Sequence, residues 1–370
     1  MSLLHKKAIE FFYIEFNRFR ITIPGMILMK YLNRLPEPNE LKQRLKISHD
    51  MFHKKELRDQ EIADILRGVS KKKIIIIGPC SSDNESSILD YVSRLAIIQE
   101  SVKDKLLIIP RVYTAKPRTK GCGYMGMLHQ PDKSSNEDVV KGIEQVRKIH
   151  IKVFNESELS TADEILYPDV YEYISDLLTY CSIGARTVES QEHRLLASGI
   201  SCPVGMKNPT SGDLSVMLNA IFASQMPHRM LYMGWEVQTD GNPLSHAILR
   251  GSSLFGIEKQ NCTISEFNYL RKHYKTPVFQ VPSVIVDVSH SNALGNYNNQ
   301  IYNCYNLIKL CNLYGWVNRM IKGLMIESYI EDGRQNVNGC CYGKSITDPC
   351  IGWKKTYDLL MKIANDWNII

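Results

Sequence analysis

The sequence has no apolar run that approaches the roughly 18 residues of a membrane-spanning helix. Charged residues such as Glu10, Glu15 and Arg18 interrupt the apolar N-terminal patches, which argues against a secretory leader. It also contains no P-loop and no GxSxG nucleophile motif, and the glycine pattern at 121–126 follows a basic loop instead of a strand. These absences exclude a membrane partner, a P-loop nucleotidase, a dinucleotide-binding motif at that position and a serine hydrolase of that type.

Cysteine occurs without any pattern of pairing. The ten cysteines are scattered and form no CxxC motif, and the adjacent Cys340 and Cys341 are poorly placed to bridge each other. Free thiols in this distribution are typical of a reducing compartment. We therefore expect a cytoplasmic protein.

The positive charge is small and concentrated at one end. The formal net charge is +6, and residues 1–46 carry nine Lys/Arg against four Asp/Glu, which leaves 36 against 35 in the remaining 324 residues. A nucleic-acid site needs a basic face on the folded body, so we expect no nucleic-acid partner. The alternative, binding through the basic N-terminal arm, predicts salt-sensitive affinity that disappears when residues 1–45 are deleted.

The chain divides into a short arm and one large domain. Residues 1–45 contain the break Pro24-Gly25 and two further prolines, Pro36 and Pro38, and we expect this arm to contact another subunit or to be partly disordered. With 44% hydrophobic and 23% charged residues, the chain has enough apolar material for a large core. We assign residues 46–370 to a single catalytic domain.

Short apolar runs alternate with helical patterns from about residue 70 onward. The predicted strands are 73–78, 106–113, 159–163, 182–185, 202–206, 229–233, 284–288 and 323–326. The predicted helices are 86–101, 135–154, 169–179, 189–198, 213–224, 264–274, 297–313 and 352–366. Eight alternations predict an α/β fold, the (β/α)8 TIM barrel, with an N-terminal extension. The surplus stretch 237–250 predicts a β-hairpin insertion near the sixth strand.

Chemically capable side chains follow these strands at their carboxyl ends, where a barrel places its active site. Four of them are metal-type ligands on separate loops: Cys80, His290, Glu327 and Asp348. One soft, one borderline and two hard ligands suit one divalent ion, Mn²⁺, Fe²⁺, Co²⁺ or Zn²⁺, without selecting among them. Each residue alone is equally compatible with a buried thiol, a hydrogen-bonded imidazole or a surface acid. Only their shared position indicates a metal site.

Six cations share the same predicted rim: Arg111, Lys116, Arg118, Arg186, Lys207 and Arg250. Arginine binds phosphate or carboxylate through two hydrogen bonds, and lysine acts as a point charge. Any one of them is explained by a solvated ion pair. As a set they require an anion, which indicates two phosphorylated substrates or one substrate with both a phosphate and a carboxylate.

Seven stretches then show a resemblance to a known family. They are GPCSSD (78–83), RVYTAKPRT (111–119), IGARTVESQEHRLLASGISCPVGMKN (183–208), HAILRG (246–251), DVSHSN (287–292), MIES (325–328) and GKSITDPCIGW (343–353). From about residue 35 to the C-terminus, the chain resembles the class I 3-deoxy-D-arabino-heptulosonate 7-phosphate (DAHP) synthases of the microbial feedback-regulated branch. The resemblance implies condensation of phosphoenolpyruvate with erythrose 4-phosphate, with release of phosphate, as the first step of the shikimate pathway. It also implies a homodimer or homotetramer.

The resemblance assigns roles to individual residues. It implies the metal ligands Cys80, His290, Glu327 and Asp348, the last also within reach of substrate. It implies phosphoenolpyruvate contacts from Arg111, Lys116, Arg186, Lys207, Arg250 and the Ala185 backbone N–H. It implies erythrose 4-phosphate contacts from Lys116, Pro117, Arg118 and Thr119. Two catalytic residues follow: Lys116, between the substrates, as the proton donor, and Glu164, near the reacting carbons, to steer water.

Two related alternatives stay open. A related synthase uses arabinose 5-phosphate, although the strings KPRT and GARTVESQ favour the four-carbon sugar. A non-catalytic regulatory paralogue predicts broken metal ligands, whereas all four are intact.

The positions that line the family's inhibitor pocket are altered. Tyr171-Glu172 stands where the regulated enzymes have Pro-Gln, and Met230 and Tyr232 replace their Phe and Ser, while Ser201 is retained. Because Tyr232 is bulkier than serine, we expect it to fill the cavity of an aromatic effector. The resemblance therefore implies weak or altered feedback by phenylalanine.

Overall fold

A computed structural model describes residues 29–118, 121, 123–133 and 135–368 of the chain. The chain divides into two units, residues 1–36 and 37–370, and residues 29–36 of the first have no regular secondary structure. Helix α2 (Pro38–Arg44) lies within the expected arm but belongs to the second unit, where its Leu41 is buried. Contact of the arm with another subunit stays a prediction.

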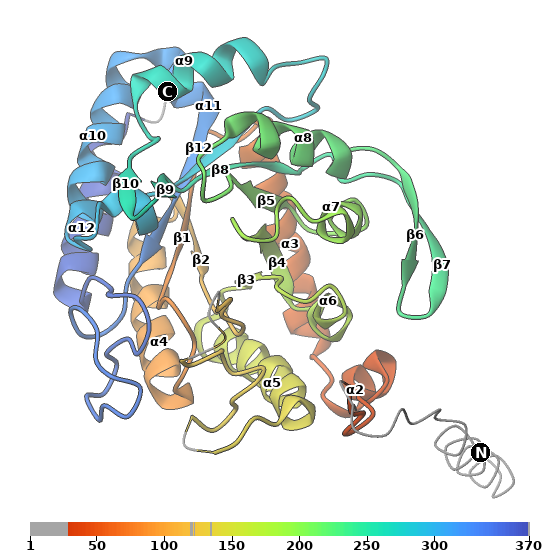
Figure 1. Cartoon of the computed structure of the whole chain (residues 1–370). Helices are drawn as coiled ribbons and strands as arrows, with labels where there is room; N and C mark the ends of the chain where they lie inside the picture. Colours follow the sequence, from red (N-terminus) through yellow and green to blue (C-terminus); the bar gives the residue numbers. More distant parts are fainter. Residues whose placement is uncertain (1–28, 119–120, 122, 134, 369–370) are drawn as a thin grey trace, which may run out of the picture. The chain divides into compact units, whose positions relative to one another are not determined.

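Eight parallel strands form the centre of the second unit (Figure 1). They are β1 (Lys73–Gly78), β2 (Leu106–Pro110), β3 (Thr161–Glu164), β4 (Leu178–Ile183), β5 (Val204–Lys207), β8 (His246–Leu249), β11 (Val284–Asp287) and β12 (Ile321–Glu327). They pair in the order β2-β1-β12-β11-β8-β5-β4-β3, and the isolated bridge between Arg111 and Ala162 links the two outer strands. The predicted (β/α)8 barrel is confirmed.

Helices surround this barrel (Figure 1). They are α3 (His49–Arg67), α4 (Glu85–Val102), α5 (Val139–Ser157), α6 (Val170–Ile174), α7 (Gln191–Ala197), α8 (Leu214–Ser224), α9 (Ile264–His273), α10 (Asn299–Leu313), α11 (Gly315–Met320) and α12 (Trp353–Asp366), with a 3-10 turn at His290–Ala293. Several begin at side-chain caps, since Ser48, Asn84 and Asp138 each accept a backbone N–H of the first turn. In the described chain no helix is both long and apolar enough to cross a membrane.

Alternate residues of β1 belong to two packed layers. In β1, Ile74 and Ile76 join the cluster inside the barrel, whereas Ile75 and Ile77 join the cluster between strands and helices. Burial on both faces explains why this strand is a continuous isoleucine run. Leu66 of α3 also joins the inner cluster, so α3 covers the amino-terminal end of the barrel and leaves the opposite end for a site.

The sixth barrel strand differs from the prediction. Residues 229–233, predicted as that strand, belong to the hairpin of β6 (His228–Tyr232) and β7 (Trp235–Thr239), which extends away from the barrel (Figure 1). The sixth barrel strand is β8, so the insertion lies at 228–239 and not at 237–250. The physical reason is burial: Leu231 in β6 is 85% exposed, while every residue of β8 is buried.

The region around the fourth strand also differs. The predicted helix 169–179 ends at Ile174 in α6, and β4 begins at Leu178 instead of residue 182. Leu178 to Ile183 are all buried, so this apolar stretch is a central strand and not the end of a helix. A second short hairpin, β9 (Ser252–Leu254) and β10 (Ile257–Lys259), follows the sixth barrel strand.

Candidate active site

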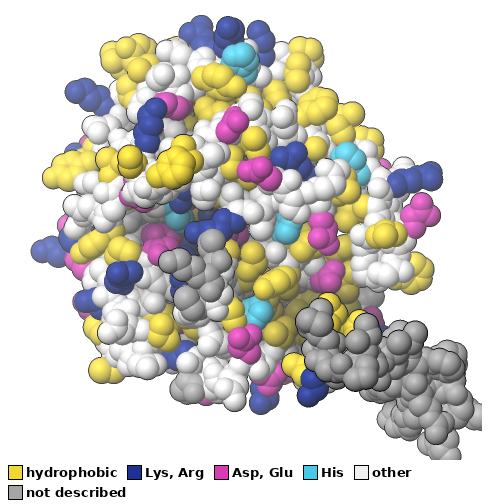
Figure 2. Space-filling model, in the orientation of Figure 1, with side chains coloured by type: hydrophobic (Ala, Val, Ile, Leu, Met, Phe, Trp, Pro, Cys, Tyr) yellow, Lys and Arg dark blue, Asp and Glu magenta, His cyan; other side chains and the backbone are white. Residues whose placement is uncertain are grey.

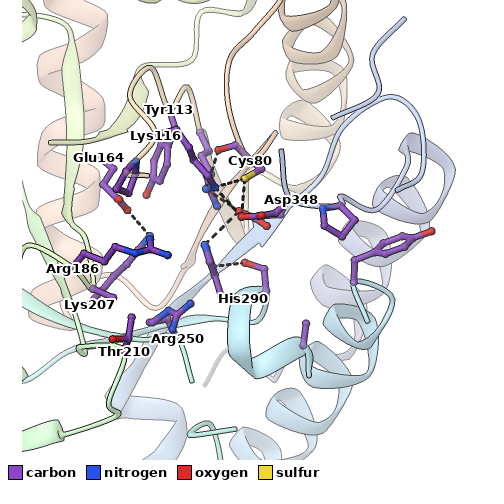
Figure 3. A pocket seen from close by; sticks show the side chains of 18 of the residues that line it. Cys80, Tyr113, Lys116, Glu164, Arg186, Lys207, Thr210, Arg250, His290 and Asp348 are labelled. Atoms are coloured by element: carbon purple, nitrogen blue, oxygen red, sulfur yellow. Dashed lines mark hydrogen bonds and ion pairs between the residues drawn. The ribbon is translucent and has the colours of Figure 1, made fainter. Parts of the chain in front are cut away.

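A pocket of about 300 Å³ lies at the carboxyl ends of the barrel strands (Figure 3). The predicted site residues that line it are Cys80, Arg111, Lys116, Pro117, Arg118, Glu164, Ala185, Arg186, Lys207, Arg250, His290, Glu327 and Asp348. The fourteenth, Thr119, lies outside the described residues. In Figure 2, Lys, Arg, Asp, Glu and His side chains lie close together near the middle of the face shown. The structure therefore gathers loops from across the chain into one place.

Three of the predicted metal ligands form a tight group. One ligand atom each of Cys80, Glu327 and Asp348 lies within 4.8 Å of the others, and the Cys80 Sγ is 3.2 Å from the Asp348 Oδ2. Strand register explains part of this proximity: β1 and β12 pair so that Gly78 lies opposite Glu327, and Cys80 follows two residues later. Asp348 comes from the loop before α12.

His290 lies beside this group. Its Nε2 is 3.6 Å from the Glu327 Oε1, and its Nδ1 is 2.8 Å from the Asp287 Oδ2. Its backbone φ of +45° is rare for a residue with a side chain. Burial opposes ionisation of Asp287, but the His290 imidazole and the Lys207 ammonium hold the pKa of that carboxyl well below its usual range. The hydrogen-bond partner of Nδ1 is the Ser289 Oγ at 2.9 Å, whereas the Asp287 Oδ2 lies close without an aligned donor among the described residues, and Nε2 is the nitrogen that faces Glu327.

These residues fit a divalent transition-metal ion. The set of one thiol, one imidazole and two carboxylates suits Mn²⁺, Fe²⁺, Co²⁺ or Zn²⁺ better than Mg²⁺ or Ca²⁺, which prefer oxygen alone. The Glu327 Oε1 is buried and has no hydrogen-bond partner among the described residues, although Arg111 Nη2 lies 2.9 Å away out of alignment. Burial and the Glu327 carboxylate raise the pKa of the Cys80 thiol to about 12, although Lys116 opposes this shift. A bound cation would favour the thiolate instead.

Lys116 contacts two of the candidate ligands (Figure 3). Its Nζ is 2.7 Å from the Cys80 Sγ and 2.8 Å from the Asp348 Oδ2. Burial lowers the pKa of Lys116, but the Cys80 and Asp348 side chains outweigh burial and hold it above its ordinary value. The pKa of Asp348 is likewise held well below its usual range, because the Lys116 ammonium outweighs burial. Lys116 is therefore a charged donor beside the ligand group.

A second cationic wall lies deeper in the pocket. Lys207 Nζ is 2.6 Å from the Glu164 Oε2, and the ring of Tyr113 stacks under the Arg111 guanidinium at 3.9 Å. Burial raises the pKa of Glu164, yet Lys207 outweighs it and the net shift is downward, so Glu164 is ionised. The Nε and Nη1 of Arg111 are buried and have no acceptor among the described residues. These N–H groups indicate an anionic ligand.

The outer cations, Arg118, Arg186 and Arg250, have fewer neighbouring carboxylates to balance their charge. Burial lowers the pKa of Arg250, Asp287 partly offsets this effect, and the neighbouring Arg186 lowers the pKa further. Arg250 donates to the Ser291 Oγ at 3.3 Å, a neutral partner. No ion pair is formed by Arg118, Arg186 or Arg250 with the described carboxylates under a 4.0 Å limit. These three guanidinium groups therefore remain available to phosphate.

Several lining residues were not singled out from the sequence. Tyr113 lies within the quoted string RVYTAKPRT, so its signal was present but was not used. Thr210, Glu258 and Tyr297 also line the pocket and belong to no motif. Glu258 comes from β10, a strand of three residues that is too short to show a period.

Comparison with known proteins gives a consistent result. Residues 45–361 match the model of the DAHP synthetase I family. The Phe-sensitive phospho-2-dehydro-3-deoxyheptonate aldolase of Escherichia coli K12 is 36% identical over 318 residues, covering 82% of this chain and 86% of that protein. The Trp-sensitive enzyme of Buchnera aphidicola is 33% identical over 342 residues, covering 90% and 95%.

A solved structure is similar as well. The phospho-2-dehydro-3-deoxyheptonate aldolase from Francisella tularensis SCHU S4 superimposes with a TM-score of 0.85 at 29% sequence identity. The match covers 92% of this chain and 99% of that one.

Proposed function

The chain belongs to the DAHP synthetase I family, and from this premise we propose how its own residues carry out the family's reaction. It is a transferase that condenses phosphoenolpyruvate with D-erythrose 4-phosphate, releases inorganic phosphate and begins the shikimate pathway to aromatic amino acids. One observation carries the assignment to this pocket: six Lys and Arg side chains line it beside a group of metal-type ligands. Two phosphorylated substrates and one Lewis acid require such a combination.

Phosphoenolpyruvate binds along the deep wall and the outer cations. Arg111 and Lys207 each already have a carboxylate partner, and the N–H donors that remain, such as the unpartnered Nε and Nη1 of Arg111, suit the singly charged substrate carboxylate. Arg186 and Arg250 have no such partner among the described carboxylates within 4.0 Å, which suits the phosphate dianion. The backbone N–H of Ala185, directly after β4 and Gly184, adds one donor to the phosphate.

Erythrose 4-phosphate binds along residues 116–119. Arg118 and Thr119 hold its phosphate, and Pro117 limits where the sugar chain lies. The Arg118 Nε donates to the Tyr124 backbone oxygen at 2.8 Å, which orients the guanidinium toward the pocket that it lines. Lys116, at the start of this segment and 2.8 Å from the Asp348 Oδ2, would face the aldehyde end of the sugar.

Cys80, His290, Glu327 and Asp348 would hold one divalent ion. When bound, it supplies Lewis-acid polarisation of the aldehyde carbonyl. Carbon 3 of phosphoenolpyruvate attacks the aldehyde carbon, and the new carbon–carbon bond leaves negative charge on the former aldehyde oxygen. Lys116 donates its Nζ proton to that oxygen, a transfer that needs a charged donor within hydrogen-bond reach.

Glu164 directs the second half of the reaction. Lys207 keeps its carboxylate ionised, so Glu164 accepts a proton from the water that adds at carbon 2. The carbon–oxygen bond to phosphate then breaks as the carbon 2 hydroxyl passes its proton to the departing phosphate and becomes the ketone, and Arg186 and Arg250 retain that phosphate until release. The Lys207–Glu164 pair therefore serves substrate binding and also keeps the proton acceptor in its ionised form.

The direct test is consumption of phosphoenolpyruvate in the presence of erythrose 4-phosphate, with and without a chelator. We expect consumption that depends on the sugar and is lost with the metal. Arabinose 5-phosphate, offered in parallel, should give a much lower kcat/KM. The absence of consumption that depends on erythrose 4-phosphate in metal-loaded enzyme would refute the proposed function.

A matched pair of variants tests the division between the two substrates. Arg186→Gln should raise the KM for phosphoenolpyruvate by about tenfold or more, and Arg118→Gln should do the same for erythrose 4-phosphate. Each variant serves as the control of the other, since each loses one guanidinium from the same pocket. If both substitutions raise the KM of the same substrate, the assignment of the two phosphate positions is wrong.

The metal and the assembly need separate measurements. Reconstitution of metal-free enzyme with Mn²⁺, Fe²⁺, Co²⁺ and Zn²⁺ in turn identifies the ion that supports turnover. We propose a homodimer or homotetramer, which light scattering of the purified chain distinguishes from a monomer.

A further inference from the structure

The barrel has a seam between β2 and β3. Adjacent strands pair through ladders from β2 round to β3, but these two outer strands share only the bridge between Arg111 and Ala162 among the described residues. One backbone hydrogen bond, from Val112 N to Ala162 O at 2.9 Å, accompanies that bridge. The chain on one side of the seam continues to Lys116, and the chain on the other side ends at Glu164.

The buried carboxylate of Asp163 connects the two sides of this seam behind the pocket through hydrogen bonds. Asp163 is 1% exposed, and its Oδ1 accepts the Thr114 backbone N–H at 3.1 Å and the Glu164 backbone N–H at 2.7 Å. Its Oδ2 accepts the Thr114 hydroxyl at 2.5 Å. The side chain therefore joins the two segments where the backbone ladder has stopped.

A histidine of helix α5 also contacts this carboxylate. His150 of α5 is buried; its Nε2 is 3.3 Å from the Asp163 Oδ2 and its Nδ1 is 2.7 Å from the Thr161 Oγ1. If the Thr161 hydroxyl donates to Nδ1, the proton on Nε2 points to the carboxylate. Burying a carboxylate has a large desolvation cost, and Asp163 has no Lys or Arg within 4.0 Å among the described residues. Such a group is not needed to fill space, because an apolar residue would do so at lower cost.

We infer that Asp163 is a positioning residue that sets residues 114–118 against Glu164 through Thr114. This inference rests on the proposed function, because the proposed function assigns residues 116–118 to the binding of erythrose 4-phosphate. The other phosphate cations are attached elsewhere: Arg186 follows β4 and Arg250 follows β8. Arg111 is held from the other side, since its backbone N–H donates to Ile77 of β1.

The inference predicts an effect on one substrate only. Loosening the seam displaces Lys116 and Arg118 but leaves four of the five phosphoenolpyruvate cations, Arg111, Arg186, Lys207 and Arg250, on their own strands. The KM for erythrose 4-phosphate should therefore rise and kcat should fall, while the KM for phosphoenolpyruvate stays near that of wild type. A merely structural role would instead reduce the amount of active enzyme and leave both KM values unchanged.

The experiment compares Thr114→Val with Thr114→Ser in the metal-loaded full chain. Valine keeps the shape but removes the hydroxyl donor, and serine keeps the donor. We expect Thr114→Val to raise the KM for erythrose 4-phosphate about tenfold and Thr114→Ser to stay within about twofold of wild type. Should Thr114→Val not fold, Asp163→Asn, which keeps the shape and one acceptor oxygen, is measured with the same expectation.

Three results would overturn the inference. One is an unchanged KM for erythrose 4-phosphate in the folded variant. Another is an equal rise in both KM values, and the third is lower activity and thermal stability with both KM values unchanged. Inactivity of the wild-type enzyme would instead count against the proposed function, so the two failures are distinguishable.

Discussion

The buried His246 makes the stability of the barrel depend on pH. His246 begins β8 and is fully buried, with its Nε2 2.7 Å from the Tyr180 hydroxyl and its Nδ1 2.8 Å from the Leu244 backbone oxygen. Both ring nitrogens are satisfied when the ring is neutral, because Nδ1–H donates to Leu244 and Nε2 accepts from Tyr180. Burial lowers the pKa of His246 from 6.5 to about 4, although the hydrogen bond to Leu244 opposes this shift.

The sign of the effect follows from proton binding in the two states. In the unfolded chain the imidazole regains its ordinary pKa of about 6.5, so between that value and about pH 4 the unfolded state binds more protons than the folded state. The free energy of unfolding is therefore highest above the unfolded pKa and falls as the pH drops through this window. From about pH 7 to about pH 5 the loss from this one residue is about 2 kcal/mol.

Equilibrium urea unfolding of the wild type and His246→Gln at both pH values tests this reasoning. Glutamine does not titrate and keeps polar atoms near Tyr180 and Leu244. Other titrating groups contribute equally to both proteins, so the comparison isolates the histidine. We expect the wild type to lose about 2 kcal/mol more than the variant on acidification. Equal losses in the two proteins would show that His246 titrates normally in the fold, and the argument from burial would then be wrong.

Three further predictions concern the site. Cys80→Ser should weaken binding of the divalent ion, measured as bound metal after dialysis, and retention of wild-type metal content would remove Cys80 from the ligand set. Lys116→Met should lower kcat by about 10²–10⁴-fold while calorimetry still detects phosphoenolpyruvate, and an unchanged kcat would end its role as proton donor. Tyr171 donates to or accepts from the Ser201 Oγ at 3.1 Å, and Tyr232 is packed against the core. Calorimetric titration with phenylalanine should therefore show weak or no binding, and tight binding would contradict the filled inhibitor pocket.

The alternation of strands and helices was predictable because burial has a simple signature in the sequence. A parallel strand covered on both faces is a continuous apolar run, as in β1. The sixth strand was missed because β8 is only four residues long and begins with a histidine. That histidine is tolerated in the core because Tyr180 of β4, 66 residues away, provides its partner. Local patterning contains no information about such a distant contact.

The position of the site was predictable for a different reason. The carboxyl ends of parallel strands meet at one rim, so a residue that follows a strand is placed without knowledge of side-chain contacts. The contacts themselves were not predictable, since Lys116 and Asp348 are 232 residues apart and Thr114 meets Asp163 only across the seam. The functional roles came from the motifs, and the hydrogen bonds that support them came from the fold.

The cations of the pocket have two functions that cannot be separated by a single substitution. Lys207 lies against Glu164 and Lys116 against Asp348, and each cation lowers the pKa of the carboxyl that it contacts. Removing either lysine therefore withdraws a proposed substrate contact and also favours protonation of an acid that the proposed reaction needs ionised. Arg186 and Arg250 differ, because neither forms an ion pair within 4.0 Å with a described carboxylate. Loss of activity in a lysine variant consequently measures binding and protonation together, whereas the outer arginines report on phosphate binding more directly.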